Sequence, residues 1–216
     1  MDYKAILFDL DGTLTDPKVG ITKSVQYALA KFNIEEPDLD KLVPFIGPPL
    51  VESFQEFYSL SKEQAADGVG YYREYFTKDG MFENAVYPGI KDMLAQLAGQ
   101  GKTLIVATSK PTVYSKQIIE HFGLAQFFQL VVGSNLDGSR IHKAEIIACI
   151  LAEIVGVDRK DMVMVGDRKH DIVGAQKNEI ASIAVKYGYG TAAELTAVKP
   201  TYIVETVVEL SEILRK

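Results

Sequence analysis

The chain has 216 residues, of which 47% are hydrophobic and 24% are charged. These values are typical of a globular protein with one sizeable core and room for a small second domain, and they exclude disordered, collagen-like and disulfide-scaffold proteins. The formal net charge of −6 and the pI near 5.2 argue against a nucleic-acid polymer or an anionic membrane as the partner.

An apolar run over Lys4–Leu10 predicts a buried strand at the start of the chain. Asp9 and Asp11 are expected just past its carboxyl end, where open parallel sheets bind ligands, because a fully buried strand cannot hold unpaired acids. Two such carboxylates can hold a cation such as Mg²⁺, or one can attack as a nucleophile while the other acts as general acid and base. The alternative is a plain acidic turn at Asp9–Gly12.

Residues 16–83 contain no convincing strand pattern. Helices are expected over Val19–Phe32, Leu50–Tyr58 and Lys62–Phe76. Because this segment of roughly 70 residues is too long for a simple crossover, it predicts an inserted helical domain that begins soon after Asp11. Between two of these helices, Gly47 offers a backbone N–H that can approach a ligand closely, and the alternative is a plain interhelical turn.

The rest of the chain alternates short apolar strands with helices. Strands are expected over Thr103–Ala107, Leu130–Gly133, Met162–Val165, Ser182–Val185 and Tyr202–Val204, and helices over Ile90–Ala98, Thr112–Phe122, Ala144–Ile154, Asp171–Lys177 and Thr206–Leu214. This alternation predicts an α/β protein with a parallel sheet covered on both faces. We expect residues 1–15 and 84–216 to form this core and residues 16–83 to form the helical domain.

Several later strands also end in polar groups that could meet at one ligand. After the second strand, Thr108 or Ser109 is expected to bind a phosphate oxygen, and the other hydroxyl could cap the next helix. We favour Thr108 for the phosphate because it lies nearer the strand. Lys110 is a further candidate for phosphate binding, with a solvated surface lysine as the alternative.

A lysine and two aspartates complete the candidate site. Lys143 opens a predicted helix, where a cation is unfavourable against the helix dipole, and this favours a functional role. Asp167 follows an apolar strand and a glycine, as a third metal carboxylate would. Asp171, one helical turn further on, is expected to bind the metal directly or through water, or to orient Lys143.

Four other features are assigned structural roles. His142 and His170 are flanked by cations and are expected to titrate at the surface. Cys149, the single cysteine, is expected in the core or at its boundary. The segment Tyr187–Gly190 is expected to form a loop wall.

Four motifs in order, Asp9–Thr13, Thr108, Lys143 and Gly166–Asp171, resemble those of the haloacid-dehalogenase-superfamily phosphatases over nearly the whole chain. The resemblance implies a Rossmann-like core with an inserted α-helical cap, a Mg²⁺ cofactor, attack by Asp9 to form an aspartyl-phosphate, and proton transfer by Asp11. It argues against a true dehalogenase, because family members that cleave carbon–halogen bonds lack the second aspartate.

Within that family the chain is similar to the branch named phosphoglycolate phosphatase or 5′-nucleotidase, on the segments 45–50, 107–111, 136–140 and 166–171. The expected function is Mg²⁺-dependent hydrolysis of a small phosphorylated metabolite of phosphoglycolate or 5′-nucleotide type. A phosphomutase of the β-phosphoglucomutase type and a non-catalytic binding protein are the alternatives. A Mn²⁺-dependent glycosyltransferase is disfavoured, since it would not need the later lysine and Gly-Asp motifs.

The candidate site follows from these assignments. The expected catalytic residues are Asp9, Asp11, Thr108 and Lys143, the expected substrate contacts are Thr108, Ser109, Lys110 and Gly47, and the expected metal ligands are Asp9, Asp11, Asp167 and Asp171. A cytoplasmic monomer or homodimer without a membrane or nucleic-acid partner is expected, because the sequence shows no long apolar run and no signal peptide.

Overall fold

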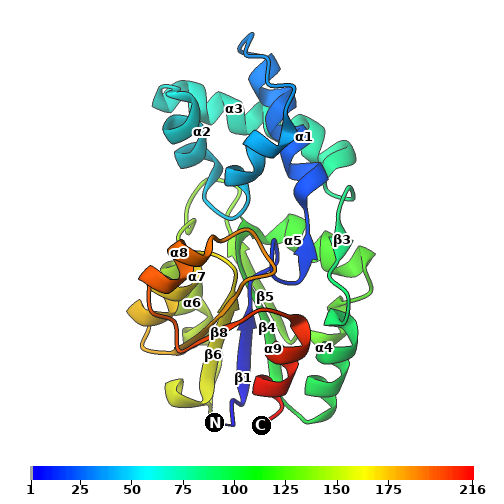
Figure 1. Ribbon diagram of the computed structural model, residues 1–216, viewed down its shortest axis with the longest axis vertical. Coiled ribbons are helices and arrows are strands. Elements are labelled where there is room, and N and C mark those ends of the chain that lie inside the picture. The colour runs from blue at the N-terminus through cyan, green and yellow to red at the C-terminus, as the bar shows by residue number, and fades with distance from the viewer. Residues whose placement is uncertain (1) are drawn as a thin grey trace. The chain divides into compact units, whose positions relative to one another are not determined.

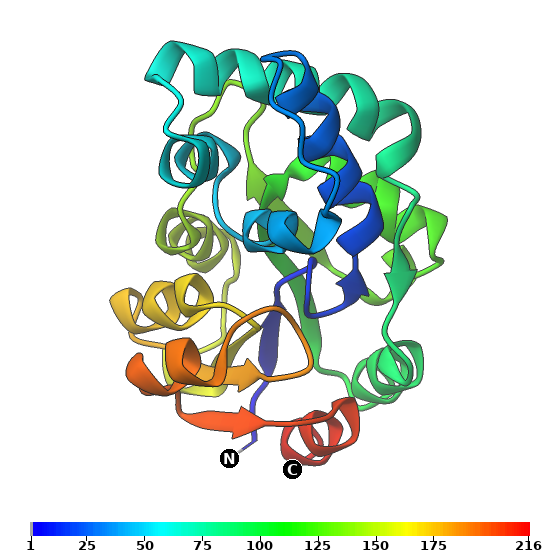
Figure 2. The ribbon, with the colours of Figure 1, turned by 45° about the horizontal axis from the view of Figure 1, so that its top comes forward.

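The computed structural model describes residues 2–216, and the chain divides into two compact units. One unit comprises the residues up to Asp16 together with Val86–Lys216, and the other comprises Pro17–Ala85. The sequence places the corresponding junctions after residues 15 and 83. Figure 2 shows how the chain leaves the sheet-containing unit after its first strand and returns to it later.

The first unit is built on a six-stranded sheet in which every neighbouring pair is parallel. Its order is β5 (Leu130–Ser134), β4 (Thr103–Pro111), β1 (Ala5–Phe8), β6 (Met162–Gly166), β7 (Ala181–Val185) and β8 (Tyr202–Val204). The chain adds strands on one side of β1 and then on the other, so the winding reverses beside β1. Ligands of open α/β sheets bind at the carboxyl ends of strands at such a reversal.

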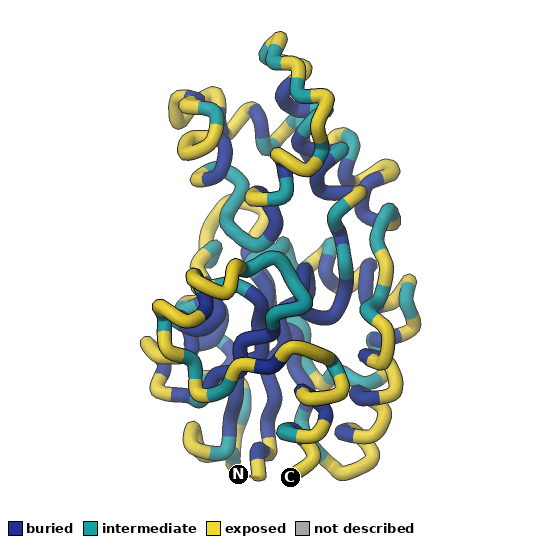
Figure 3. Tube along the Cα trace, viewed as in Figure 1, coloured by how far each residue is buried: buried dark blue, intermediate teal, exposed yellow. Residues whose placement is uncertain are grey.

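Helices lie on both faces of this sheet, with α6, α7 and α8 on one side and α4 and α9 on the other (Figure 1). The helices of this unit are α4 (Ile90–Gly99), α5 (Thr112–His121), α6 (Lys143–Glu153), α7 (Lys169–Lys177), α8 (Ala192–Ala197) and α9 (Val207–Leu214), with short 3₁₀ turns at Ala125–Phe127 and Arg159–Asp161. Ile146 and Ile150 of α6 share a buried cluster with Leu7 of β1. All four residues of β1 are buried, and Figure 3 shows the strands as the buried centre of the unit.

The second unit is helical. It contains α1 (Lys18–Ala30), a 3₁₀ segment (Leu39–Phe45), α2 (Leu50–Tyr58), α3 (Lys62–Tyr75) and a π-helical turn (Phe76–Gly80). The Ser61 hydroxyl accepts from Gln64 N, and the Gln64 side chain accepts from Ser61 N, so a capping box begins α3. The rings of Phe45 and Phe54 pack edge to face with centroids 5.1 Å apart.

The α/β class with a parallel, doubly covered sheet is confirmed, and three details differ from the sequence expectation. The strand β4 continues to Pro111 instead of ending at Ala107, with an irregular register beyond Ala107. A two-stranded pair, β2 (Thr15–Asp16) and β3 (Ala85–Val86), and the short helix α8 were not predicted, since elements of this length carry too few residues to show a period. Among the described residues, no helix is long and apolar enough to cross a membrane.

Candidate active site

Asp9 is the first residue after β1 and is held at the centre of the sheet. Its backbone N–H donates to Val165 O at 2.9 Å, and its carboxylate Oδ1 accepts from Leu10 N at 2.8 Å. The chain then turns sharply, with Gly12 N donating to Thr15 O at 2.7 Å and Gly12 at a φ of 79°. A Cβ at Gly12 would lie 2.2 Å from Asp167 Oδ2, so the turn packs directly against Asp167.

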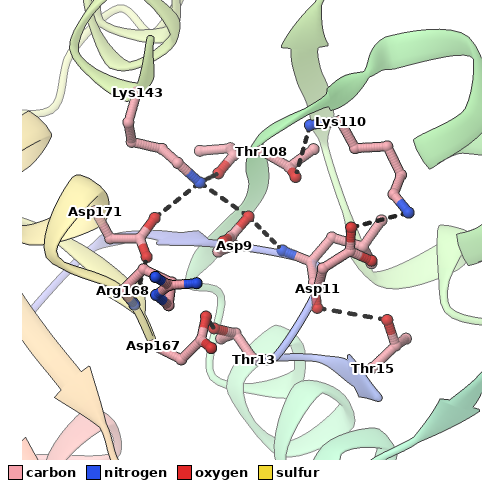
Figure 4. Close-up of polar contacts among 12 residues, drawn as sticks. Asp9, Asp11, Thr13, Thr15, Thr108, Lys110, Lys143, Asp167, Arg168 and Asp171 are labelled. Atoms are coloured by element: carbon pink, nitrogen blue, oxygen red, sulfur yellow. Dashed lines mark hydrogen bonds and ion pairs between the residues drawn. The ribbon is translucent and has the colours of Figure 1, made fainter. Parts of the chain in front are cut away.

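Lys143 joins the candidate site from the first position of α6. Its ammonium group pairs with Asp9 Oδ1 at 2.9 Å and Asp171 Oδ1 at 2.8 Å, and it donates to Ala107 O at 2.9 Å (Figure 4). Burial opposes the charge, but Asp171 and Asp9 outweigh it and raise the pKa of Lys143 above its usual value. A buried lysine whose charged form is favoured by two carboxylates therefore faces Asp9.

Three buried carboxylates gather beside this lysine. Asp9, Asp167 and Asp171 each offer an oxygen within 4.8 Å of the others. Asp171 Oδ2 accepts from Arg168 N at 3.1 Å, where α7 begins. Burial, together with the charges of Asp171 and Asp9, raises the pKa of Asp167 well above its usual value. Three carboxylates carry more negative charge than the one lysine can neutralise. A divalent cation that binds oxygen ligands, such as Mg²⁺, would neutralise the excess, so these residues fit this metal.

The Asp11 side chain lies outside this group of three carboxylates, and its expected role in metal binding stays a prediction. Its Oδ2 pairs with Lys110 Nζ at 2.8 Å, and both side chains are buried. Among the described residues, nothing hydrogen-bonds to Asp11 Oδ1. Burial raises the pKa of Asp11, although Lys110 opposes the shift. The two-residue spacing of Asp9 and Asp11 does not predict that their side chains lie apart. Their directions depend on the turn that the chain makes after Asp9 and closes at Thr15.

The hydroxyl residues after β4 occupy different environments. Thr108 is 2% exposed, and its Oγ1 accepts from Lys110 N at 3.3 Å. Ser109 is half-buried. The expectation that one of them caps the next helix is wrong, since α5 begins at Thr112 after Pro111 and has no side-chain cap. The reason is that Pro111, which has no side-chain oxygen, occupies the N-cap position directly before Thr112.

The two histidines differ from each other. His142 is exposed, as expected. The surface prediction for His170 is wrong: it is half-buried in the first turn of α7, where burial and the charges of Arg168 and Lys169 lower its pKa to about 4. Cys149 is half-buried and packs against the core cluster, which confirms its boundary position.

The segment Tyr187–Gly190 was expected to form a loop wall, but its backbone contacts the Asp167 carboxylate directly. Tyr189 N donates to Asp167 Oδ2 at 2.7 Å, and the Tyr187 hydroxyl donates to Thr13 O at 3.0 Å. No sequence motif signals the first contact, because its donor is a backbone group that any residue could supply. The paired glycines were the one available hint of a close backbone approach.

Comparisons with known proteins agree with this geometry. Residues 6–185 match the family described as haloacid dehalogenase-like hydrolase. A 5′-nucleotidase of Pseudomonas aeruginosa is 47% identical and covers 98% of this chain and 96% of that protein. The crystal structure of a predicted phosphatase from Clostridium acetobutylicum has a TM-score of 0.96 and 49% identity over 100% of both chains. Tyrosine-protein kinase PtkA of Mycobacterium tuberculosis is 36% identical over 97% of this chain and 72% of that protein.

Proposed function

The chain belongs to the haloacid dehalogenase-like hydrolase family, and we propose that it is a Mg²⁺-dependent phosphomonoesterase of small metabolites, of 5′-nucleotide or phosphoglycolate type. As a member of this family it is an enzyme, a hydrolase that acts on phosphate esters. One observation carries the proposal most directly: the buried Lys143 pairs with Asp9 beside the two further carboxylates Asp167 and Asp171. Phosphoryl transfer needs a nucleophile, and it needs positive groups nearby that stabilise the negative charge of the phosphoryl oxygens.

In the proposed reaction Asp9 attacks the phosphorus atom. Its contacts with Leu10 N and Lys143 are both made by Oδ1, which leaves Oδ2 as the attacking oxygen. A bond forms between Asp9 Oδ2 and phosphorus while the bond from phosphorus to the leaving alcohol oxygen breaks. Lys143 and the Thr108 hydroxyl are the proposed partners of the phosphate oxygens, with Ser109 and Lys110 as further substrate contacts.

Asp11 is the proposed general acid and base. Burial raises the pKa of Asp11, which favours the protonated form that can donate to the leaving oxygen. In the second half of the reaction the ionised Asp11 accepts a proton from water, and that water oxygen attacks the phosphorus of the aspartyl-phosphate. The bond from phosphorus to Asp9 then breaks and inorganic phosphate is released, which restores both aspartates.

Asp9, Asp167 and Asp171 would hold the metal, and Mg²⁺ bound there would offset charge on the phosphate oxygens. We expect exhaustive chelation to abolish turnover of p-nitrophenyl phosphate and added Mg²⁺ to restore it. Ca²⁺ should not restore turnover, since it prefers more ligands and a looser geometry. Steady-state assays of chelated enzyme with each ion make the measurement, and full activity of the chelated enzyme would contradict the proposal.

The acceptor of the phosphoryl group needs its own test, because a 36% identical relative is named a tyrosine kinase. The enzyme is incubated with a panel of nucleoside 5′-monophosphates, phosphoglycolate and sugar phosphates, with and without a tyrosine peptide or a second sugar phosphate. We expect inorganic phosphate to equal the substrate consumed in every case, because water is the proposed acceptor. Phosphate missing from this balance and found on the peptide or sugar would overturn hydrolysis.

Gly47 is the proposed substrate contact of the second unit, and it has a φ of 104°. We expect Gly47→Ala to lower kcat/KM for the preferred metabolite by about tenfold or more, and to lower it much less for p-nitrophenyl phosphate. Gly138→Ala is the matched control, since Gly138 also has a positive φ of 85° and a Cβ there meets nothing within 4 Å. Equal losses on both substrates would leave Gly47 as a structural turn.

A further inference from the structure

The loop after β7, residues 186–190, joins parts of the candidate site that are far apart in the sequence. The Tyr189 amide contacts the Asp167 carboxylate, as described above. The Tyr187 hydroxyl donates to Thr13 O at 3.0 Å, and the Tyr189 hydroxyl donates to the Asp16 carboxylate. One loop therefore contacts both the acid that follows β6 and the segment 13–16 that follows Asp11.

The backbone of this loop lies too close to Asp167 for side chains. A Cβ at Gly188 would lie 2.3 Å from Gly12 O and 2.5 Å from Asp167 Oδ2, and a Cβ at Gly190 would lie 1.9 Å from Asp167 O. Contacts this short require the backbone or Asp167 to move. Glycine at these two positions is therefore what allows the Tyr189 amide to reach the carboxylate.

The loop is also supported on its other side. The ring of Tyr187 packs edge to face on Tyr87, with centroids 5.1 Å apart, and its hydroxyl is fixed by Thr13 O. Thr13 in turn donates from Oγ1 to Asp167 Oδ1 at 3.4 Å. Asp167 is thus approached by a backbone donor on one oxygen and a hydroxyl donor on the other, and the same loop anchors both donors.

We propose that residues 187–190 are a positioning element that sets the orientation of Asp167 for metal binding, with Tyr187 and Tyr189 as anchors and Gly188 as the point of close approach. The inference rests on the proposed function, because it takes Asp167 as a Mg²⁺ ligand. Groups that orient a metal ligand typically change the metal affinity by about 10–100-fold when they are altered. The loop residues themselves are not proposed to touch the metal or the substrate.

The test is Mg²⁺ binding to the metal-free full chain, measured by isothermal titration calorimetry without substrate. Gly188→Ala should weaken Mg²⁺ binding by about tenfold or more, because the new Cβ displaces the Asp167 carboxylate. The double variant Tyr187→Phe/Tyr189→Phe keeps all backbone groups but loses both hydroxyl anchors, and should weaken binding by about threefold or more. Gly99→Ala is the matched control, since a Cβ at Gly99 meets nothing within 4 Å, and should bind Mg²⁺ as the wild type does.

Circular dichroism checks that each variant is folded. If Gly188→Ala does not fold, the Mg²⁺ affinity of the double variant alone tests the positioning role. Folded variants that bind Mg²⁺ within about twofold of the wild type overturn the inference. Hydrolysis of p-nitrophenyl phosphate by the wild type separates the two claims. If the wild type is active and Mg²⁺-dependent, such a result rejects the positioning role alone; if the wild type neither binds Mg²⁺ nor hydrolyses the ester, the proposed function itself is rejected.

Discussion

Asp9→Asn should lower kcat for p-nitrophenyl phosphate by about a thousandfold or more, because the variant lacks the nucleophile of the proposed reaction. The fold should persist. An asparagine oxygen can still accept from Leu10 N and from Lys143, which contact Asp9 Oδ1 at 2.8 and 2.9 Å. The substitution also removes one of three like charges in a buried cluster, so the thermal unfolding midpoint should not fall.

Asp158→Asn is the control for this experiment, because the Asp158 side chain is 75% exposed and pairs with the exposed Lys160 at 3.5 Å. It should leave kcat unchanged. Rapid acid quenching followed by mass spectrometry should find one phosphoryl group on the Asp9 peptide of the wild type and none on the Asp9→Asn protein. Retention of more than about a tenth of wild-type activity, or a phosphoryl group on His142 or His170, would contradict Asp9 as the nucleophile.

The parts of the site that the sequence predicted share one physical feature. Asp9 and Asp167 follow runs of apolar residues that must be buried, so the end of each run fixes where the first acid stands. Lys143 stands out in the sequence because a cation at the start of a helix is unfavourable unless something nearby stabilises it, and Asp9 and Asp171 lie within ion-pair distance of it. In both cases a charged residue occupies a position where its charge is unfavourable, the end of a buried strand or the start of a helix. Such a position can be identified from the sequence alone.

The parts that were missed depend on directions and on backbone groups. The pairing of Asp11 with Lys110 depends on how the turn after Asp9 orients one side chain, and residue spacing does not encode that orientation. The Tyr189 amide contact with Asp167 joins residues 22 positions apart through a group common to all residues but proline. The burial of His170 depends on the packing of α7, whereas its charged sequence neighbours suggested exposure.

Lys143→Met should reduce the free energy of unfolding by about 3–5 kcal/mol in metal-free buffer, because it leaves buried carboxylates without their cation. The Lys143 side chain is 3% exposed, and its two carboxylate partners, Asp9 and Asp171, are 5% and 1% exposed, so water cannot replace the lost partner easily. The backbone acceptor Ala107 O also loses its donor. Urea denaturation measures the change, and the same variant should lose turnover because Lys143 is a proposed partner of the phosphate oxygens.

A second substitution shows whether Lys143→Met destabilises the fold because it leaves buried carboxylate charges without a cation or because it removes the other contacts of the lysine. Breaking a buried pair usually costs more than removing both charges, so Lys143→Met/Asp171→Asn should unfold at higher urea than Lys143→Met alone. Added Mg²⁺ should also recover part of the stability of Lys143→Met, since Asp9, Asp167 and Asp171 lie within reach of one cation. Lys160→Met, which breaks the exposed pair with Asp158, should change stability far less. A double variant that is no more stable than Lys143→Met would show that the carboxylate charges do not destabilise the single variant. The lysine would then stabilise the fold through packing and its hydrogen bond to Ala107 O.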